Sequence, residues 1–206
     1  MKRLLPTNVF ETELWNKNQL HIAGVDEVGR GCFAGPVVAG AVILPHGFEN
    51  TCGIDDSKRL SPKKREELAE YIKKIALAYA VAEISVQVIN TVGIGKAVQL
   101  AFAKAVMNLN TPPDHILVDA FVIQSVSPSV QTPIIHGDRL SVTIAAASII
   151  AKVYRDELMR NLHKEYEVYD FITNKGYGTK THRLALAQYG LSPLHRTSFN
   201  LSKYTG

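Results

Sequence analysis

Residues 21–45 read HIAGVDEVGRGCFAGPVVAGAVILP, and this stretch decides the fold. Residues 21–26 are mostly apolar and end in an acid, so we expect a first strand there. Residues 35–44 are rich in valine and alanine and stop at Pro45, which is typical of a second, well-buried strand. The glycine-rich segment at 29–31 breaks the chain between the two. The stretch therefore predicts a hairpin with a wide, glycine-rich connection.

The remaining chain alternates helical and strand patterns. Apolar residues at helical spacing follow the Ser61–Pro62 start signal and recur in later segments. We expect helices from Pro62 to about residue 75, over 90–107, over 140–160 and, shorter, around 181–189, and strands over 79–88, 116–118 and 134–135. Residues 144–151 are apolar on nearly every face, so this half-helix must be buried against a sheet. The pattern predicts one α/β domain with a mixed sheet.

The composition is that of an ordinary globular protein of 206 residues, with 46 % apolar and 20 % charged residues. Lys and Arg total 23 against 19 Asp and Glu, an excess that fits a polyanionic partner but carries little weight. The two cysteines, Cys32 and Cys52, suit neither a disulfide framework nor a metal site, which favours a reducing compartment. Residues 1–20 carry no signal-peptide pattern, and no apolar run is long enough to span a membrane. We therefore expect a cytoplasmic protein without a membrane segment.

Acidic residues stand at the ends of three predicted strands: the pair Asp26 and Glu27, then Asp119, then Asp138. Open α/β sheets place functional groups at strand ends, where rigid strands meet the loops that approach ligands. Carboxylates that converge there repel one another unless a cation neutralises them. Hard oxygen ligands select Mg²⁺ or Mn²⁺. Two such ions could clamp a phosphodiester, one activating water and the other stabilising the leaving oxygen.

Each acid also has a structural interpretation. Asp119 could end its strand as a turn former, and Asp138 could be the N-cap of the long helix, which is the commoner role for an acid in that place. Asp26 and Glu27 could form a solvated turn. Adjacent strand residues point to opposite faces, so a shared site requires the pleat to bend at Glu27. The nearby glycines would permit such a bend.

Six sequence segments, taken in order, resemble the signatures of the prokaryotic ribonuclease HII family. They extend from about residue 22 to residue 199 and therefore cover nearly the whole chain. The segments are GVDEVGRG (24–31) with AGPVV (34–38), DSKRLS (56–61), ILVD (116–119), GD (137–138) with IAAASI (144–149), AKV (151–153) and RD (155–156), GYGT (176–179) with His182, and HR (195–196) with SF (198–199).

The resemblance implies a ribonuclease H-like fold, in which helices flank a central mixed sheet and the C-terminal region is helical. It implies one catalytic domain over 1–206, with an N-terminal arm at 1–20, a core at about 21–165 and a substrate-contacting extension at about 166–206. The implied activity is endonucleolytic cleavage of the RNA strand of RNA–DNA hybrids, and incision at ribonucleotides embedded in duplex DNA, leaving 5′-phosphate and 3′-hydroxyl ends. Mn²⁺ or Mg²⁺, as two ions with substrate bound, is the implied cofactor. Asp26, Glu27, Asp119 and Asp138 match the family's metal-binding catalytic set.

Other matching residues are candidates for substrate binding. In the family, the segment Gly29, Arg30 and Gly31 reads the 2′-hydroxyl that distinguishes RNA from DNA. A tight turn is the alternative interpretation, and both could hold. Tyr177, between two glycines, could pack its ring on the next deoxyribose, or it could be a core tyrosine. Lys58 is a candidate phosphate contact, which positions the substrate without specifying its sequence.

Several points stay open at the level of sequence. For His182, Arg183, His195 and Arg196 we cannot choose between backbone binding and a structural role, and for Arg59 solvated surface is the favoured interpretation. The chain departs from the common family pattern at Val28, Cys32, Gly93 and His136, none of which removes a carboxylate. No sliding-clamp docking peptide is seen, and a monomer is expected. The competing hypotheses are a non-catalytic nucleic-acid-binding module and a metal-dependent phosphatase or exonuclease.

Overall fold

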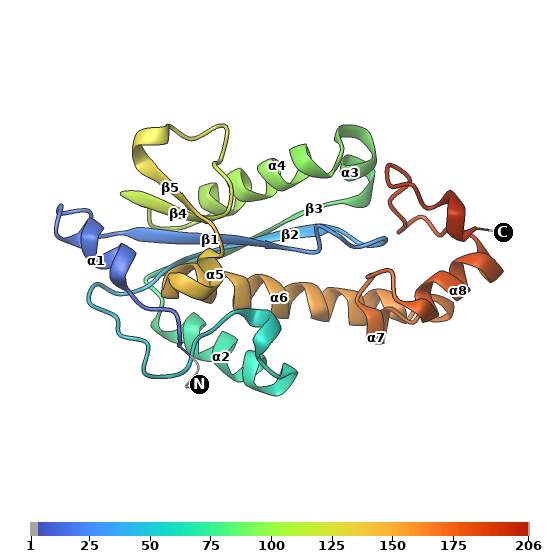
Figure 1. Ribbon diagram of the computed structural model, residues 1–206, viewed down its shortest axis with the longest axis horizontal. Helices are drawn as coiled ribbons and strands as arrows, with labels where there is room; N and C mark the ends of the chain where they lie inside the picture. The colour runs from blue at the N-terminus through green and yellow to red at the C-terminus, as the bar shows by residue number, and fades with distance from the viewer. Residues whose placement is uncertain (1–3, 206) are drawn as a thin grey trace.

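A computed structural model describes residues 4–205 and shows a five-stranded mixed sheet between layers of helices (Figure 1). The strand order is β3-β2-β1-β4-β5. The strands are β1 (Ile22–Val28), β2 (Val37–Ile43), β3 (Ala78–Ile84), β4 (His115–Asp119) and β5 (Gln131–Ile134). The predicted α/β class with a mixed sheet is confirmed. The outermost residues of the predicted arm and extension, 1–3 and 206, lie outside the described residues.

The register of the sheet places acidic strand ends together. β1 pairs antiparallel with β2, so the predicted hairpin is confirmed, and β2 pairs antiparallel with β3. β1 and β4 are parallel, as are β4 and β5. Parallel strands end at the same edge of a sheet, so the carboxyl ends of β1 and β4 meet.

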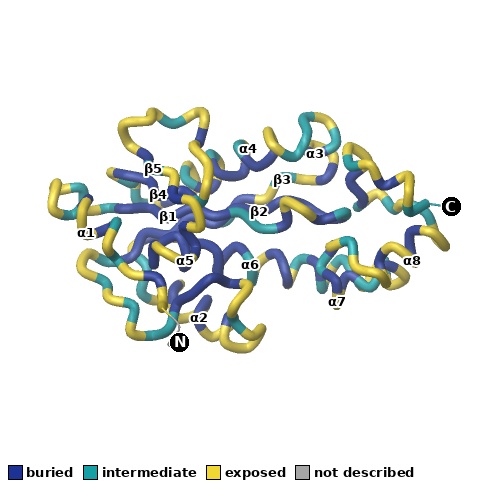
Figure 2. Tube along the Cα trace, in the orientation of Figure 1, coloured by how far each residue is buried: buried dark blue, intermediate teal, exposed yellow. Residues whose placement is uncertain are grey.

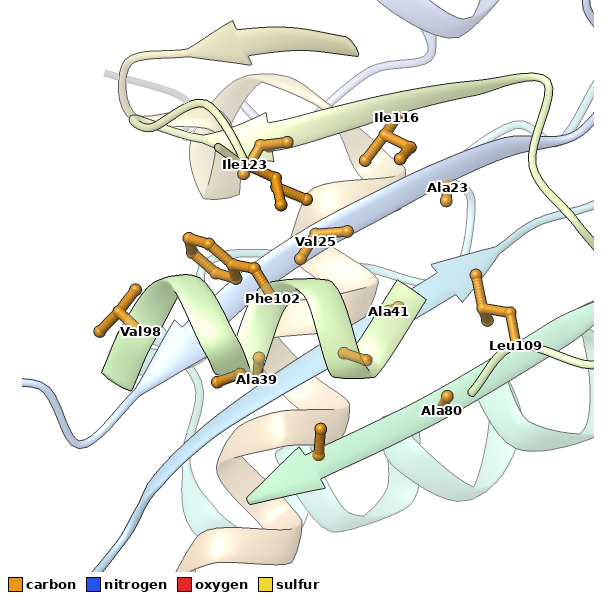
Figure 3. Packing of buried hydrophobic residues seen from close by; sticks show 14 of the residues in the cluster. Ala23, Val25, Ala39, Ala41, Ala80, Val98, Phe102, Leu109, Ile116 and Ile123 are labelled. Atoms are coloured by element: carbon orange, nitrogen blue, oxygen red, sulfur yellow. The ribbon is translucent and has the colours of Figure 1, made fainter. Parts of the chain in front are cut away.

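Helices cover both faces of the sheet (Figure 1). One face carries α4, which packs on it through the apolar cluster drawn in Figure 3, including Val25, Ala39 and Phe102. The other face carries α2 and the long α6, whose first half is buried as predicted (Figure 2). The helices are α1 (Val9–Trp15), α2 (Pro62–Ile75), α3 (Val86–Val92), α4 (Ile94–Met107), α5 (Gly137–Leu140), α6 (Val142–His163), α7 (Phe171–Asn174) and α8 (Lys180–Tyr189), with short 3₁₀ turns at 57–59, 128–130, 167–169 and 202–204.

Two predicted elements differ from the structure. The strand predicted over 79–88 ends at Ile84, because Ser85 then caps α3 by accepting a hydrogen bond from Val88 N at 3.4 Å. The helix predicted over 90–107 is divided into α3 and α4 at Gly93, whose φ of 80° lies outside the helical region. Apolar periodicity continues across this break, so the pattern alone did not reveal it.

The N-terminal arm is bound to the junction between α5 and α6. Thr7 N donates to Leu140 O at 3.0 Å, and Thr7 O accepts from Val142 N at 2.9 Å. Glu11 is fully buried, and its Oε1 accepts from Ser141 Oγ at 2.6 Å. The arm therefore supports the segment that carries Asp138. Among residues 4–205, no helix has the combined length and apolar character that crossing a membrane would require.

Two glycines allow α6 to lie directly on the sheet. A Cβ at Gly24 would stand 2.2 Å from the backbone carbon of Thr143, and one at Gly40 would stand 2.5 Å from Ala147 O. Both distances are far below van der Waals contact, so only glycine permits this approach. The close packing sets where the polar residues of α6 meet the end of β1.

Replacing Gly40 with alanine is expected to destabilise the fold by about 2 kcal/mol, because the new methyl group collides with backbone that cannot move aside. Chemical denaturation monitored by circular dichroism would measure the loss. Gly95→Ala is the matched control: its Cβ meets nothing within 4 Å, and alanine at this helical position should stabilise the fold by about 0.5–1 kcal/mol. Equal stabilities of wild type and Gly40→Ala would contradict the packing described.

Candidate active site

The four acids singled out in the sequence gather at one end of the sheet. The parallel register of β1 and β4 sets Asp26 beside Asp119. Asp119 Oδ1 accepts a hydrogen bond from Gly137 N at 2.7 Å, and this bond ties the next residue, Asp138, to the same place. Asp26 and Asp138 are buried, with exposed fractions of 3 % and 4 %. Carboxylates far apart in sequence thus share one small region.

Glu27 reaches the region while its strand remains in the sheet. β1 stays paired with β2 through Val28, so Glu27 is still part of the hydrogen-bonded ladder. Its carboxylate is nevertheless close enough to Asp119 and Arg30 for their charges to shift its pKa. Glu27 lies next to the end of β1 and lines the same cleft as Lys58 and Ser148.

The structural alternatives are resolved in part. The N-cap of α6 is Ser141, whose Oγ accepts from Ile144 N at 3.2 Å, so the capping role considered for Asp138 is wrong. Asp119 does begin a turn, because its carbonyl accepts from Phe121 N at 2.7 Å. Its carboxylate still lies within the acidic group, so the two roles coexist.

Burial and mutual repulsion shift the pKa values of these acids upward. Burial raises the pKa of Asp26 well above its ordinary value, and the charges of Glu27 and Asp119 raise it further. Burial, followed by the charge of Asp119, likewise raises the pKa of Glu27. For Asp138, burial is again the largest cause of a raised pKa, followed by the charge of Asp56. A cation among the carboxylates would relieve this repulsion.

The donor chemistry fits a hard divalent cation, because all four side chains offer carboxylate oxygens. Glu27 Oε2 is buried and accepts no hydrogen bond from residues 4–205, so it is available to a cation. In that part of the chain, however, no three acidic, histidine or cysteine side chains form a complete ligand set. The carboxylates would therefore have to draw together around the ion, which neutralises the repulsion between them.

Lys58 supplies positive charge to the acidic group. Its Nζ lies 3.6 Å from Asp138 Oδ2. Burial by itself would lower the pKa of Lys58, but the charges of Asp26 and Asp138 outweigh that effect and raise it. Asp56 positions the segment, since it accepts from Lys58 N at 2.9 Å and pairs with Arg139 Nε at 3.2 Å.

A cleft of about 190 Å³ opens beside the acids, lined by Glu27, the turn 29–31, Lys58, Ser148 and Tyr177, among others. The tight-turn interpretation of 29–31 is confirmed by the hydrogen bond from Cys32 N to Gly29 O at 3.3 Å.

Tyr177 is 37 % exposed, so it is not a core residue. Burial raises the pKa of Tyr177 to about 12. A larger hollow of about 460 Å³ between β3 and α6 contains none of the four acids.

Two fully buried arginines hold the walls of this cleft. Arg155 donates to two carbonyls within residues 34–36 at 3.0 and 3.1 Å and to Lys175 O at 2.9 Å. Arg196 donates to Arg30 O at 2.9 Å and twice more to a carbonyl within 34–36. The two side chains thus join the glycine-rich connection to the loop that carries Tyr177. Arg196 has a structural role, which the sequence had left open.

Sequence reasoning gave no role to several of these residues on α6. Ser148 forms a hydrogen bond with Ser57, Oγ to Oγ, at 2.9 Å, and its hydroxyl acts on Asp26 to lower the pKa of that carboxyl, against the larger effect of burial. Together with Lys152 and Arg155 it forms a polar stripe at spacings of i, i+4 and i+7 on a helix that is otherwise apolar there. Such a stripe on a buried helix could have identified all three positions.

His182 and His195 form a buried, neutral pair whose tautomers are set by their neighbours. Ser192 N donates to His195 Nδ1 at 2.9 Å, so the proton of His195 is on Nε2. That proton is donated to His182 Nε2 at 3.0 Å, which leaves His182 Nδ1 to donate to Tyr177 O at 2.9 Å. The pair therefore anchors the backbone of Tyr177. Burial, followed by the charge of His182, lowers the pKa of His195 to about 4.

Comparisons of sequence and of fold with known proteins identify relatives of this chain. A family model described as Ribonuclease HII matches residues 23–202. Ribonuclease HII of Oceanobacillus iheyensis is 47 % identical over 198 residues, 96 % of this chain and 75 % of that protein. The Alkaliphilus metalliredigens protein of that name is 51 % identical over 196 residues, 92 % of this chain and 95 % of that protein. The solved structure of ribonuclease H2 from Pyrococcus horikoshii superposes with a TM-score of 0.72 at 26 % identity, covering 89 % of this chain and 96 % of that one. The resemblance and fold inferred from the motifs are confirmed.

Acidification is expected to weaken the fold through His195. Its pKa is about 4 in the folded protein, against about 6.5 for an unfolded histidine. The unfolded chain binds the proton first, so the contribution of neutral His195 is complete above about pH 6.5 and is lost as the pH falls towards 4. By about pH 5 the loss should be about 2 kcal/mol. Urea unfolding at neutral pH and at about pH 5 would measure it.

His195→Gln is the matched control, because its amide keeps a neutral donor but does not titrate. The comparison is needed because the raised pKa values of Asp26, Glu27 and Asp138 act in the opposite direction, favouring the fold as the pH falls. Wild type should lose more unfolding free energy on acidification than the variant. Equal losses would contradict the assignment to His195.

Proposed function

We propose that this protein, besides cutting RNA in RNA–DNA hybrids, incises duplex DNA at single embedded ribonucleotides. The chain belongs to the ribonuclease HII family and is therefore a ribonuclease H. The proposed products are 5′-phosphate and 3′-hydroxyl ends. The observation that carries the proposal is the gathering of Asp26, Glu27, Asp119 and Asp138 beside a cleft whose wall is the turn 29–31. Acids that could hold cations thus stand next to a segment that could read a sugar.

We assign the four carboxylates to the binding of two Mg²⁺ or Mn²⁺ ions. When bound, such ions supply Lewis-acid activation of water and stabilise charge on the departing 3′-oxygen. The side chains themselves hold the acidic site in place: Asp119 through its bond to Gly137 N, and Asp26 through Ser148. Lys58, next to Asp138, would contact the anionic phosphate of the substrate.

The cleft walls are assigned to substrate reading. Gly31 is exposed, and its missing Cβ leaves room for a sugar to approach the backbone of the turn. We assign the ring of Tyr177, which lines the cleft, to packing on the following deoxyribose and so to marking the step from RNA to DNA. Residues 21–165 would form the catalytic core, with the arm 1–20 bound to it. Residues 166–206 would be the extension that brings Tyr177 to the cleft.

Replacing Asp138 with asparagine is expected to lower the cleavage rate about a thousandfold or more, because one anionic metal ligand is lost. Binding of the hybrid, measured by fluorescence anisotropy, should persist. The variant should not melt at a lower temperature, since the raised pKa of Asp138 means that its charge opposes folding. Glu165→Gln removes one exposed negative charge and is the control. Full activity of Asp138→Asn would defeat the assignment.

A duplex that contains one ribonucleotide tests the proposed substrate directly. Incision on the 5′ side of the ribonucleotide, dependent on Mn²⁺ or Mg²⁺ and blocked by chelator, is expected. It would exclude both a non-catalytic binding module and a phosphatase or exonuclease. Failure to cut this duplex while a long hybrid is cut would remove the single-ribonucleotide activity from the proposal.

Gly31→Ala separates substrate reading from folding. A Cβ at Gly31 meets no protein atom within 4 Å, so the thermal midpoint should stay unchanged. Cleavage at a ribonucleotide should fall about tenfold or more, because the methyl group occupies the space of the sugar and removes a hydrogen bond to the 2′-hydroxyl. Binding of an all-DNA duplex serves as the internal control. Wild-type cleavage by this variant would rule out the turn as the sugar reader.

A further inference from the structure

A second groove, of about 360 Å³, lies between the start of α4 and the turn after Asp119. Arg30, Lys96, Gln99, Phe121 and Gln124 contribute to its lining. Arg30 also lines the catalytic cleft, so the groove and the cleft share a wall. None of the roles assigned above uses the rest of this groove.

Phe121 is brought to the groove by a tight turn. Its backbone N donates to Asp119 O at 2.7 Å, while Ala120 between them has a φ of 59°, which is unusual for a residue other than glycine. Phe121 is 36 % exposed, and the guanidinium carbon of Arg30 lies 4.6 Å from the centroid of its ring. An exposed aromatic residue thus stands beside a cation, two residues after one of the four acids.

The loop that bears Phe121 is held by α4. Gln99 Nε2 donates to Val122 O at 2.9 Å, and Gln99 Oε1 accepts from Gln124 N at 2.8 Å. The amide of Gln99 is therefore occupied on both sides. The groove has a fixed wall, since a side chain from a packed helix orders the loop.

Lys96 is the charge available to a ligand. It is exposed and stands three residues before Gln99, so the two share a face of α4. Within residues 4–205 it forms no ion pair, and no acidic residue lines the groove. The lining includes Gly95 in the first turn of α4, where the helix dipole also favours an anion.

We propose that this groove is a binding subsite for a phosphodiester of the substrate duplex beyond the position that is cut. Lys96 and Arg30 would face the phosphate charge, and Phe121 would offer its ring to the adjoining sugar or base. Exposed cations beside an aromatic surface are the combination that binds nucleic-acid strands. The inference rests on the proposed function, because a polyanion in the catalytic cleft must already pass Arg30.

Lys96→Ala tests the subsite, with Lys104→Ala as the matched control, since Lys104 is an exposed lysine of the same helix that does not line the groove. On a long ribonucleotide-containing duplex, Lys96→Ala should raise KM about tenfold and leave kcat unchanged, as expected for one lost charged contact. The slope of log K against log salt should fall by about 0.9. Lys104→Ala should match wild type in both. Phe121→Leu should also raise KM, whereas Phe121→Tyr, which keeps an aromatic ring, should have the KM of wild type.

Substrate length supplies the decisive comparison. In a series of duplexes shortened one base pair at a time from either end, wild type should lose its advantage over Lys96→Ala once the strand no longer reaches the groove. Equal KM and salt slope for wild type and Lys96→Ala on every duplex, or equal losses in both lysine variants, would overturn the subsite.

Anisotropy measurements with chelator present keep this test separate from the proposed function. They report binding of the same duplexes without cleavage. If wild type cuts no ribonucleotide-containing duplex, the proposed function fails, while a binding difference confined to Lys96→Ala would still support the groove.

Discussion

The direct contact between α6 and the sheet is the constraint on which the rest of the site depends. Gly24 and Gly40 remove the side chains that would hold the helix away. Helix α6 then presents, along one stripe, Ser148 to Asp26 and Arg155 to the glycine-rich connection. Asp138 lies just before the same helix, so one packed element sets the positions of the acids and of the cleft wall together.

The site concentrates negative charge and surrounds it with cations. Three of the four acids have raised pKa values, first from burial and then from neighbouring carboxylates. This arrangement opposes folding, because ionised groups are held in a poorly solvated place. Lys58 and Arg30 offset part of the repulsion at the rim. A region so arranged gains from binding a divalent cation, which is consistent with the activity proposed.

Much of the fold was predictable because local pattern and global structure agree. The hairpin over 21–45, the apolar half of α6 and the α2 start at Ser61 follow from composition and capping chemistry. The break at Gly93 and the end of β3 before Ser85 were missed, since apolar spacing runs through both. The structural roles of Arg155 and Arg196 were not decided by the sequence for another reason: each charge is satisfied by main-chain carbonyls of segments distant in sequence.

By itself, the sequence determined the α/β class, the family and the identity of the four candidate acids, because strand ends, glycines and ordered motifs are local signals. Only the tertiary structure decided how those acids meet. It showed that Asp119 holds Gly137, that Ser141 rather than Asp138 caps α6, and that Glu27 remains paired within the β1–β2 ladder. Those outcomes depend on strand register and on the distance between helix and sheet. Both arise from packing among segments that are remote in sequence, so no single segment predicts them.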